Sequence, residues 1–375
     1  MNFQPYPFEK LNQLFSTVKP NEKYSPLALT IGEPQFDTPA FIIDEFKKSA
    51  HLLNKYPKIA GDESLKTAQI DFVKRRFDIT LKNDELVTTV GTREALFNLP
   101  QFLLFNKTNP RVAYPNPFYQ IYEGATIAAR GTSVLMPLLA KNGFKPKLDE
   151  EVLKTCDLVM LNSPSNPTGS VMSLDELCTW VKLALKHNFV LINDECYSEI
   201  YTDKAPQSLL EASKKAGNEN FKNILVLNSI SKRSSAPSLR SGFVAGDATL
   251  LKGYAQYRTY AGCVAPLPAQ LSAALAWSED LHVKTSQEKY AKNFELAKQI
   301  LHVNPSDATF YIWLEVPNDE EFAKNLYKEK NVKVLAGSYL GRDGIGHDRV
   351  RIALVLNEAD TKEALNRIKD FMEGK

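Results

Sequence analysis

The chain has 375 residues, enough to bury a large core and to form one large domain with a smaller one. Hydrophobic residues make up 43% and charged residues 24%, as in globular proteins rather than disordered or membrane-spanning ones. A net charge of +2 gives no basis for binding nucleic acid, and no apolar run is long enough to cross a bilayer.

Cysteine and histidine usage indicates the compartment and argues against a metal. The four cysteines are scattered without a CxxC pair, which fits a reducing cytoplasm and argues against disulfides and zinc. The histidines form no cluster with ligand spacing. The first residues, Met1–Pro5, lack a basic region followed by an apolar one, so we expect no signal peptide.

The N-terminal third begins with a segment that is predicted as a loop. Residues before about Ala40 are rich in Pro and predict a loop, which ends in the turn Ile31-Gly32-Glu33-Pro34. Amphipathic helices are predicted for Phe41–Leu53 and Glu63–Arg76. Between them lies Tyr56, followed by Pro57. On residue chemistry alone, both turns are ordinary.

Apolar runs then alternate with helical segments, and polar residues follow each run. The runs that predict buried strands are Glu85–Val90, Arg111–Tyr114, Asp157–Leu161, Phe189–Asp194, Ile224–Leu227 and Phe243–Ala245. A helix from the capping box at Ser173 to His187 separates two of them. Strands alternating with helices predict a mostly parallel α/β sheet, whose ligands bind at the carboxyl ends of the strands.

Those strand ends carry the candidate functional residues. Gly91-Thr92, before a helix that starts at Arg93, is a junction that offers free amides to an anion. The rigid loop Pro115–Tyr119 fixes an aromatic ring. Asp194 ends a buried strand, where an unpaired carboxylate is costly and needs a cation.

One loop concentrates charge and hydroxyl groups. Ser229-Ile230-Ser231-Lys232 follows a buried strand, and Arg240 and Gly242 come eight and ten residues after the lysine. Hydroxyls and an Arg fork suit a phosphate, and a Lys near an apolar sheet can become a nucleophilic amine. A solvated basic loop is the alternative.

The C-terminal third predicts a small α+β domain. Helices are expected at 250–260, 267–277, 283–301, 320–329 and 360–372, and strands at 310–314, 332–335 and 349–353. The helix from Val283 to Leu301 would link the domains. Arg351 points away from Val350 and Ile352 on its strand, and a strand Arg on the core side implies a bidentate anion.

The motifs taken together resemble those of the class I and II aminotransferases, which are pyridoxal 5′-phosphate (PLP) enzymes of fold type I. They follow the family's order along nearly the whole chain: Ile31–Pro34, Tyr56, Gly91-Thr92, Pro115–Tyr119, Asn166-Pro167-Thr168-Gly169, Asp194 with Tyr197, Ser229–Arg240 and Arg351. The resemblance implies a large PLP-binding domain over residues 41–282 and a small domain from residues 1–40 and 283–375.

The resemblance also implies roles for cofactor-binding residues. Lys232 would hold PLP as a Schiff base and move the substrate proton, with Asp194 and Tyr197 beside it in catalysis. Asp194 would pair with the pyridine nitrogen, and Asn166 and Tyr197 with the phenolic oxygen. The phosphate would be bound by Ser229, Arg240 and the amides of Thr92 and Arg93, and Tyr119 would stack on the ring.

Further roles concern the substrate and a partner subunit. Arg351, the Gly32 amide and Asn166 would hold the substrate's α-carboxylate side. Tyr56 would reach the phosphate bound by a partner, which predicts a homodimer with shared sites. Arg93 is also a candidate to bind a second carboxylate of the substrate. The alternative is that it only supplements the positive charge around the phosphate.

The predicted function is an amino-group transfer between an amino acid and a 2-oxo acid in the cytoplasm, without nucleic acid, membrane or metal. Ala308–Trp313, Gly337–Arg342 and the Lys232 loop resemble N-succinyldiaminopimelate aminotransferases of lysine biosynthesis, with 2-oxoglutarate as acceptor. Ser238 and Ala336 depart from that pattern. An aspartate or broad-specificity aminotransferase is the first alternative, and a PLP β-lyase is less favoured. A PLP-fold transcription regulator would need a DNA-binding extension, for which we expect no room before Gly32.

Overall fold

A computed structural model describes residues 3–304, 306 and 308–375. Its centre is a seven-stranded sheet in the order β2-β8-β7-β6-β5-β3-β4. Neighbouring strands run parallel except on either side of β8, which is antiparallel to both neighbours. The strands are β2 (Leu86–Thr89), β3 (Arg111–Asn116), β4 (Thr132–Pro137), β5 (Leu158–Asn162), β6 (Val190–Asp194), β7 (Ile224–Ser229) and β8 (Gly242–Gly246).

Helices cover both faces of this sheet because its strands are apolar on both sides. Leu158 and Met160 of β5 pack with α4, α5 and α10, whereas Val159 and Leu161 pack with α3, α7, α8 and α11. The helices are α2 (Ala40–Ser49), α3 (Glu63–Phe77), α4 (Thr92–Leu103), α5 (Ile121–Ala128), α6 (Glu150–Leu153), α7 (Leu174–His187), α8 (Leu209–Lys215), α9 (Ile230–Arg233), α10 (Ala248–Ala261) and α11 (Leu267–Ser278). This α/β arrangement is the predicted fold class.

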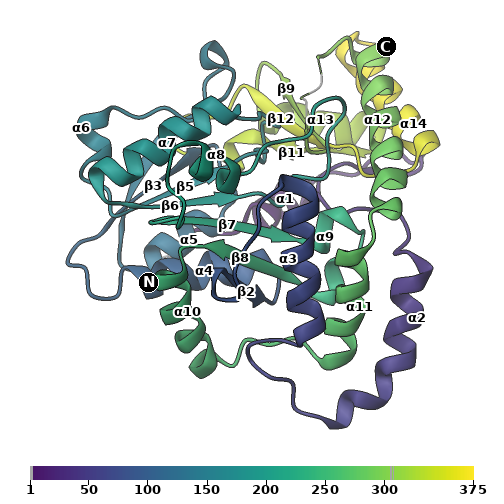
Figure 1. The fold of residues 1–375 in the computed structure, drawn as a ribbon. Helices are drawn as coiled ribbons and strands as arrows, with labels where there is room; N and C mark the ends of the chain where they lie inside the picture. Colours follow the sequence, from purple (N-terminus) through teal and green to yellow (C-terminus); the bar gives the residue numbers. More distant parts are fainter. Residues whose placement is uncertain (1–2, 305, 307) are drawn as a thin grey trace.

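A second group of elements packs around its own core (Figure 1). It contains a three-stranded antiparallel sheet, β11-β12-β9, and a parallel pair, β1-β10. The elements are α1 (Pro7–Ser16), β1 (Leu27–Ala28), α12 (Leu281–Leu301), β9 (Tyr311–Glu315), α13 (Asp319–Lys330), β10 (Val332–Lys333), β11 (Leu335–Ala336), β12 (Arg349–Ala353) and α14 (Glu358–Met372). Its core joins residues from both ends of the chain, so the chain crosses between the two groups near Ala40 and near Leu281.

Short 3₁₀ turns complete the architecture at Ala50–Asn54, Asn83–Glu85, Ala140–Asn142, Pro237–Leu239 and Gly337–Tyr339. In Figure 1, α12 runs from beside α11 to the C-terminal sheet, as expected for a connecting helix. The proposed domain limits, 41–282 against 1–40 and 283–375, stay a prediction. None of the described helices has a stretch long and apolar enough to cross a membrane.

Two predictions about secondary structure are wrong. The region before Ala40 is not only loop, because α1 presents Leu11 and Phe15 to the second core at a spacing of one helical turn. The single strand expected at 332–335 is two short ones: β10 pairs with β1, and β11 pairs with β12. Tertiary pairing therefore divides a segment that was predicted as one strand.

Candidate active site

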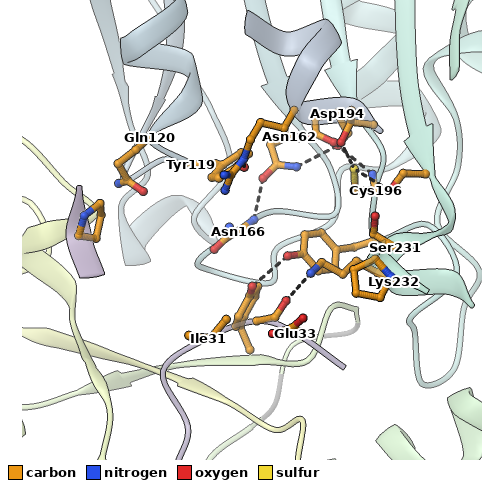
Figure 2. A pocket seen from close by; sticks show the side chains of 18 of the residues that line it. Ile31, Glu33, Tyr119, Gln120, Asn162, Asn166, Asp194, Cys196, Ser231 and Lys232 are labelled. Atoms are coloured by element: carbon orange, nitrogen blue, oxygen red, sulfur yellow. Dashed lines mark hydrogen bonds between the residues drawn. The ribbon is translucent and has the colours of Figure 1, made fainter. Parts of the chain in front are cut away.

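A cavity of about 500 Å³ lies where the carboxyl ends of β5, β6 and β7 face residues from α1, the Gly32 turn and β12. It collects nearly all of the predicted site residues: Gly32, Thr92, Arg93, Tyr119, Asn166, Asp194, Tyr197, Ser229, Lys232, Arg240 and Arg351. Tyr56 lies elsewhere, fully exposed in the loop before α3. Figure 2 shows Asn162, Asp194 and Cys196 on one side of the cavity and Ile31 and Glu33 on the other.

Lys232 lies in the short helix α9, immediately after β7. Its ammonium donates a hydrogen bond to the Gly32 carbonyl, which ties the loop to the N-terminal turn. Burial lowers the pKa of Lys232 from 10.5 to about 8, although Cys196 and Glu33 act to raise it. A lysine with this pKa supplies a neutral amine near physiological pH, as a nucleophile or a general base requires.

Asp194 ends β6 and is 4% exposed. Its carboxylate accepts hydrogen bonds from the Tyr122 hydroxyl at 3.0 Å and the Cys196 amide at 3.2 Å. Burial raises the pKa of Asp194 more than these hydrogen bonds lower it. No described cation forms an ion pair with this carboxylate, so a cationic group on a ligand would fill an evident need.

An anion-binding end lies at the start of α4. Gly91 has φ of 76°, and a Cβ there would come within 2.5 Å of Nη2 of Arg240, so the guanidinium lies directly against the turn. Arg240 is held by the carbonyls of Val90 at 3.1 Å and Pro237 at 3.0 Å. The first amides of α4, from Thr92 onward, have no partner within the helix. Together with the buried Ser229 hydroxyl, they form a surface suited to phosphate.

Arg351 supplies a second cationic end. The side chain comes from β12, and the residue is 4% exposed. Its guanidinium donates to Oδ1 of Asn166 at 2.9 Å and to the Thr30 carbonyl at 2.6 Å, while Nε has no hydrogen-bond partner in the described part of the chain. No ion pair joins it to a described acid. Since a buried cation without a counter-charge is costly, the geometry favours an anionic ligand.

A pair of tyrosines closes the cavity beside Gly32. The hydroxyls of Tyr197 and Tyr311 are 2.9 Å apart, and the Arg351 guanidinium lies 4.3 Å from the Tyr311 ring centre. A Cβ at residue 32 would lie 1.7 Å from the Tyr311 hydroxyl. Only glycine therefore fits at this position without displacing Tyr311.

Arg93 lies at the rim of the cavity between two aromatic rings. Its Nε donates to the Tyr119 hydroxyl at 2.6 Å and Nη2 to the Tyr6 hydroxyl at 3.2 Å. Tyr6 immediately precedes α1, so this contact joins the two groups of elements across the cavity. Within the described chain, Arg93 makes no ion pair and keeps its charge available to a ligand.

Comparison with known proteins identifies the family. The profile of the aminotransferases of class I and II matches residues 25–368. The chain belongs to the class I and II aminotransferases. It is a PLP-dependent enzyme that acts on small amino and oxo acids. This confirms the predicted reaction class and cofactor.

Two solved structures share this fold, and a curated relative is similar in sequence over nearly its full length. The chain is similar to the crystal structure of the aminotransferase AspB from Helicobacter pylori, at 52% identity and a TM-score of 0.98, covering 100% of both chains. It is also similar to an aminotransferase from Neisseria meningitidis, at 40% identity and a TM-score of 0.93, covering 99% of this chain and 98% of the other. The LL-diaminopimelate aminotransferase of Natranaerobius thermophilus is 32% identical, covering 99% of this chain and 97% of the relative.

The aminotransferase cavity fits PLP on its own geometry. It offers an enclosed amine, a buried carboxylate without an ion-pair partner among the described residues, and an end lined by helix amides and a guanidinium. These match an aldehyde, a pyridine nitrogen and a phosphate in chemical type. The carboxylate that lacks a cation is the most specific of the three, since a pyridinium would satisfy it.

Several cavity residues escaped sequence reasoning. Tyr6 and Phe8 belong to a region predicted as loop, although the helical spacing of Leu11 and Phe15 could have revealed α1. Cys196 and Tyr311, which line the cavity, carry no local signal that separates them from core residues. The same holds for Tyr122, which is buried outside the cavity lining and contacts Asp194. Their roles arise from packing, as in the Tyr122 bond to Asp194.

Proposed function

We propose that this aminotransferase acts on a diaminopimelate substrate, with 2-oxoglutarate as amino acceptor. The observation that carries the proposal is the pair of arginines, Arg351 and Arg93, that line one cavity without an ion pair to any described acid. A substrate with a carboxylate at each end would satisfy both. Each bidentate Arg–carboxylate contact contributes roughly 1.5–3 kcal/mol.

The catalytic work would fall to Lys232. Its amine removes the proton from the substrate Cα and delivers it later in the same half-reaction, as general base and then acid. When bound, PLP supplies an electron-withdrawing ring that stabilises negative charge at that carbon. Asp194 would keep the ring nitrogen protonated, and the hydrogen bond from Tyr122 orients this carboxylate.

The other cavity residues would bind and orient. The phosphate of PLP would be bound at the anion-binding end by the amides of Thr92 and Arg93 and the side chains of Ser229 and Arg240. Tyr119 would stack against the pyridine ring. Asn166 and Tyr197 would donate to the phenolic oxygen. Asn166 already contacts Arg351 at 2.9 Å, so one amide would serve both the cofactor and the substrate side. Gly32 and Arg351 would hold the α-carboxylate.

Two forms of the substrate have separate support. The Lys232 loop and the segments 308–313 and 337–342 resemble enzymes that use N-succinyl-LL-diaminopimelate. The relative from Natranaerobius thermophilus is named for LL-diaminopimelate. Both forms belong to lysine biosynthesis and carry a distal charged group, which Arg93 would read.

We also propose a cytoplasmic homodimer with shared active sites. Tyr56 has a relative exposure of 103%, and Leu53, three residues earlier in the chain, is 67% exposed. A fully exposed tyrosine close to an exposed leucine fits a surface that a second subunit covers. The partner's phosphate would then be within reach of Tyr56.

A substrate panel tests the proposal. Purified enzyme is supplied with N-succinyl-LL-diaminopimelate, LL-diaminopimelate, aspartate, alanine and a cysteine conjugate, each with 2-oxoglutarate, and glutamate and pyruvate are measured. We expect the highest kcat/KM for a diaminopimelate form. A preference for aspartate, or pyruvate release from the conjugate, would support the aspartate aminotransferase or the β-lyase instead.

Arg93→Gln tests the distal contact within that panel. We expect kcat/KM to fall roughly 10- to 150-fold for the diaminopimelate substrate and to change little for alanine, because only the former has a distal carboxylate. Equal losses for both substrates would show that Arg93 serves the cofactor.

A further inference from the structure

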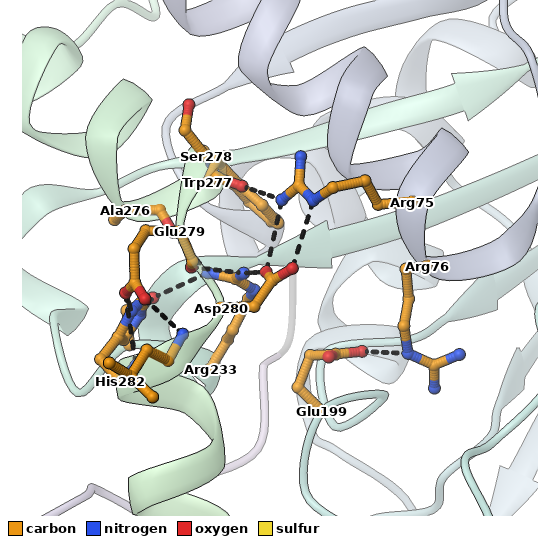
Figure 3. Close-up of polar contacts among 12 residues, drawn as sticks. Arg75, Arg76, Glu199, Arg233, Ala276, Trp277, Ser278, Glu279, Asp280 and His282 are labelled. Atoms are coloured by element: carbon orange, nitrogen blue, oxygen red, sulfur yellow. Dashed lines mark hydrogen bonds and ion pairs between the residues drawn. The ribbon is translucent and has the colours of Figure 1, made fainter.

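The residues immediately after Lys232 contact the segment between α11 and α12, where the chain passes from the large sheet to the second group of elements. Arg233 is 2% exposed although it is charged. Its guanidinium donates to the carbonyls of Ala276 and Glu279 and pairs with the Asp280 carboxylate. These partners form the junction between α11 and α12, as Figure 3 shows. The junction therefore anchors the loop by compensating the buried charge of Arg233, which would be costly without a partner.

A second arginine reinforces this anchor. Asp280 also accepts from Nε of Arg75 on α3 at 3.2 Å, and Arg75 holds the Trp277 carbonyl at 2.7 Å. Burial acts to raise the pKa of Asp280, but the opposing effect of Arg75 and Arg233 is larger. The pKa is therefore lowered, and the carboxylate stays ionised. The junction is thus fixed against α3, one of the helices that cover the large sheet.

Ser234 makes an independent contact with the same junction. Its hydroxyl lies 2.8 Å from Nε2 of His282, whose Nδ1 lies 2.5 Å from the Glu279 carboxylate. His282 is in the first turn of α12, the helix that leads to the second sheet. Arg233 and Ser234 therefore hold the junction through different groups.

The other crossing of the chain reaches the same loop. Thr38, just before α2, donates its hydroxyl to the Ser235 carbonyl at 2.6 Å. The ring of Phe41 packs edge-on against His282, with ring centres 5.4 Å apart. Both segments that join the two groups of elements, near Thr38 and near Asp280, thus converge on the three residues that follow Lys232.

We propose that Arg233, Asp280 and Thr38 are positioning residues, which hold the Lys232 amine in place and connect it to both crossings of the chain. The inference rests on the proposed role of Lys232 as the reactive lysine. None of the three lines the cavity, so none would touch substrate or cofactor. Their effect would come through the backbone of the loop.

The physical reason is the precision that proton transfer requires. A displacement of about 1 Å at a catalytic group can cost about 100-fold in rate. Lys232 lies in a helix of four residues, which is too short to hold its own position. The contacts of the following residues supply the missing restraint.

Two variants test the proposal, one at each crossing. Thr38→Val removes one hydrogen bond with little change in volume, and Asp280→Asn removes the charge that pairs with Arg233 while its side chain is 48% exposed. We expect each to lower kcat about 10-fold or more with a smaller change in KM. The double variant should lose more than either.

Matched controls lie on α14, which packs against the second core. Glu363 pairs with the buried Arg367 as Asp280 pairs with Arg233, with the carboxylate side chain 52% exposed, and Thr361 donates its hydroxyl to the Leu356 carbonyl. Glu363→Gln and Thr361→Val should lower thermal stability comparably and leave kcat unchanged. If the controls lower kcat as much, the effect is general destabilisation and the proposal fails.

A second readout does not depend on activity. In the full-length protein without cofactor, carbamylation of Lys232 by cyanate at a series of pH values, quantified by mass spectrometry, gives the pKa of its amine. A loosened loop admits water, so the pKa should rise from about 8 toward 10.5 in Thr38→Val and Asp280→Asn. An unchanged pKa with unchanged kcat would overturn the proposal.

The same preparation separates this inference from the proposed function. Borohydride reduction of wild-type enzyme with bound cofactor should label Lys232. Labelling at another lysine would refute the role of Lys232 itself. Labelling at Lys232, with normal kcat in both variants, would refute only the positioning roles.

Discussion

Single side chains in the cavity owe their chemistry to burial. In water, Lys232 would be an ammonium and Asp194 a carboxylate. Burial lowers the pKa of Lys232 and raises the pKa of Asp194, so both shifts favour the neutral form. The protein supplies no ion pair to compensate either group among the described residues. Both groups are therefore prepared for a ligand rather than for stability.

Lys232 should destabilise the protein when no cofactor is bound. Its pKa is about 8 in the folded state and 10.5 as the ordinary value, so between these pH values the unfolded chain binds more protons. The destabilisation caused by this group therefore decreases as the pH rises across that window, and the full penalty, roughly 3 kcal/mol, applies below pH 8. Lys232→Met should remove that penalty and also abolish transamination.

Chemical denaturation of both cofactor-free proteins checks this prediction. Lys232→Met should be the more stable at pH 7, and its advantage should shrink as the pH rises from about 8 to 10.5. Other alkaline effects act on both proteins and cancel in the difference. A difference that is independent of pH would contradict the pKa of Lys232.

At the scale of elements, α1 connects stability with the cavity. Leu11 is 4% exposed in the second core, while Tyr6, Pro7 and Phe8 at the start of α1 line the cavity. One face of the helix thus anchors it, and its N-terminal end covers the site. The Tyr6 hydroxyl reaches Arg93 at 3.2 Å, which makes the rim depend on how firmly α1 is held.

Leu11→Ala should therefore affect substrate binding from outside the cavity. We expect the free energy of unfolding to fall by about 2–4 kcal/mol, from lost contacts and a cavity in the core. We also expect KM for the diaminopimelate substrate to rise more than kcat falls, since the rim loosens. Denaturation curves and steady-state kinetics measure both effects.

Leu326→Ala on α13 is the control for Leu11→Ala. Leu326 is fully buried in the same core but belongs to a helix that does not line the cavity. It should lower stability by a similar amount and leave KM unchanged. A similar rise in KM for both variants would show that α1 has no special link to the rim.

At the scale of the whole molecule, the prediction concerns the partner subunit. Tyr56 is fully exposed and lies apart from the cavity of its own chain. If it completes the partner's site, then mixed dimers of Tyr56→Phe and Lys232→Ala subunits carry one site with neither lesion. Mixing the two inactive proteins by denaturation and refolding should restore part of the activity.

Two results would exclude this shared site. Full activity of Tyr56→Phe alone would show that its hydroxyl is not needed, and an active monomer in sedimentation would show that no partner is required. Mixing each variant with itself is the control, since such dimers always contain the lesion in both sites.

The local sequence determined much of the fold, because the residues that form a turn or end a strand are close together in the chain. Alternating apolar runs specified the mostly parallel sheet, whose carboxyl ends place Asn166, Asp194 and Ser229 near one another. The motif order also indicated the family and the cofactor. These signals are clear in the sequence because β5, β6 and β7 are buried on both faces and each ends at a polar turn.

Tertiary structure alone decided what depends on contacts between distant segments. Residues 332–335 contribute to two strands because Val332 and Lys333 pair with β1, whereas Leu335 pairs with β12. Hydrophobicity does not show which partner a strand will take. Likewise, Tyr122 binds Asp194 across 72 positions, and Thr38 meets Ser235 across 197. Local residue chemistry determined which groups could react, and packing between remote segments determined which of them meet, because burial and pairing are properties of the folded chain.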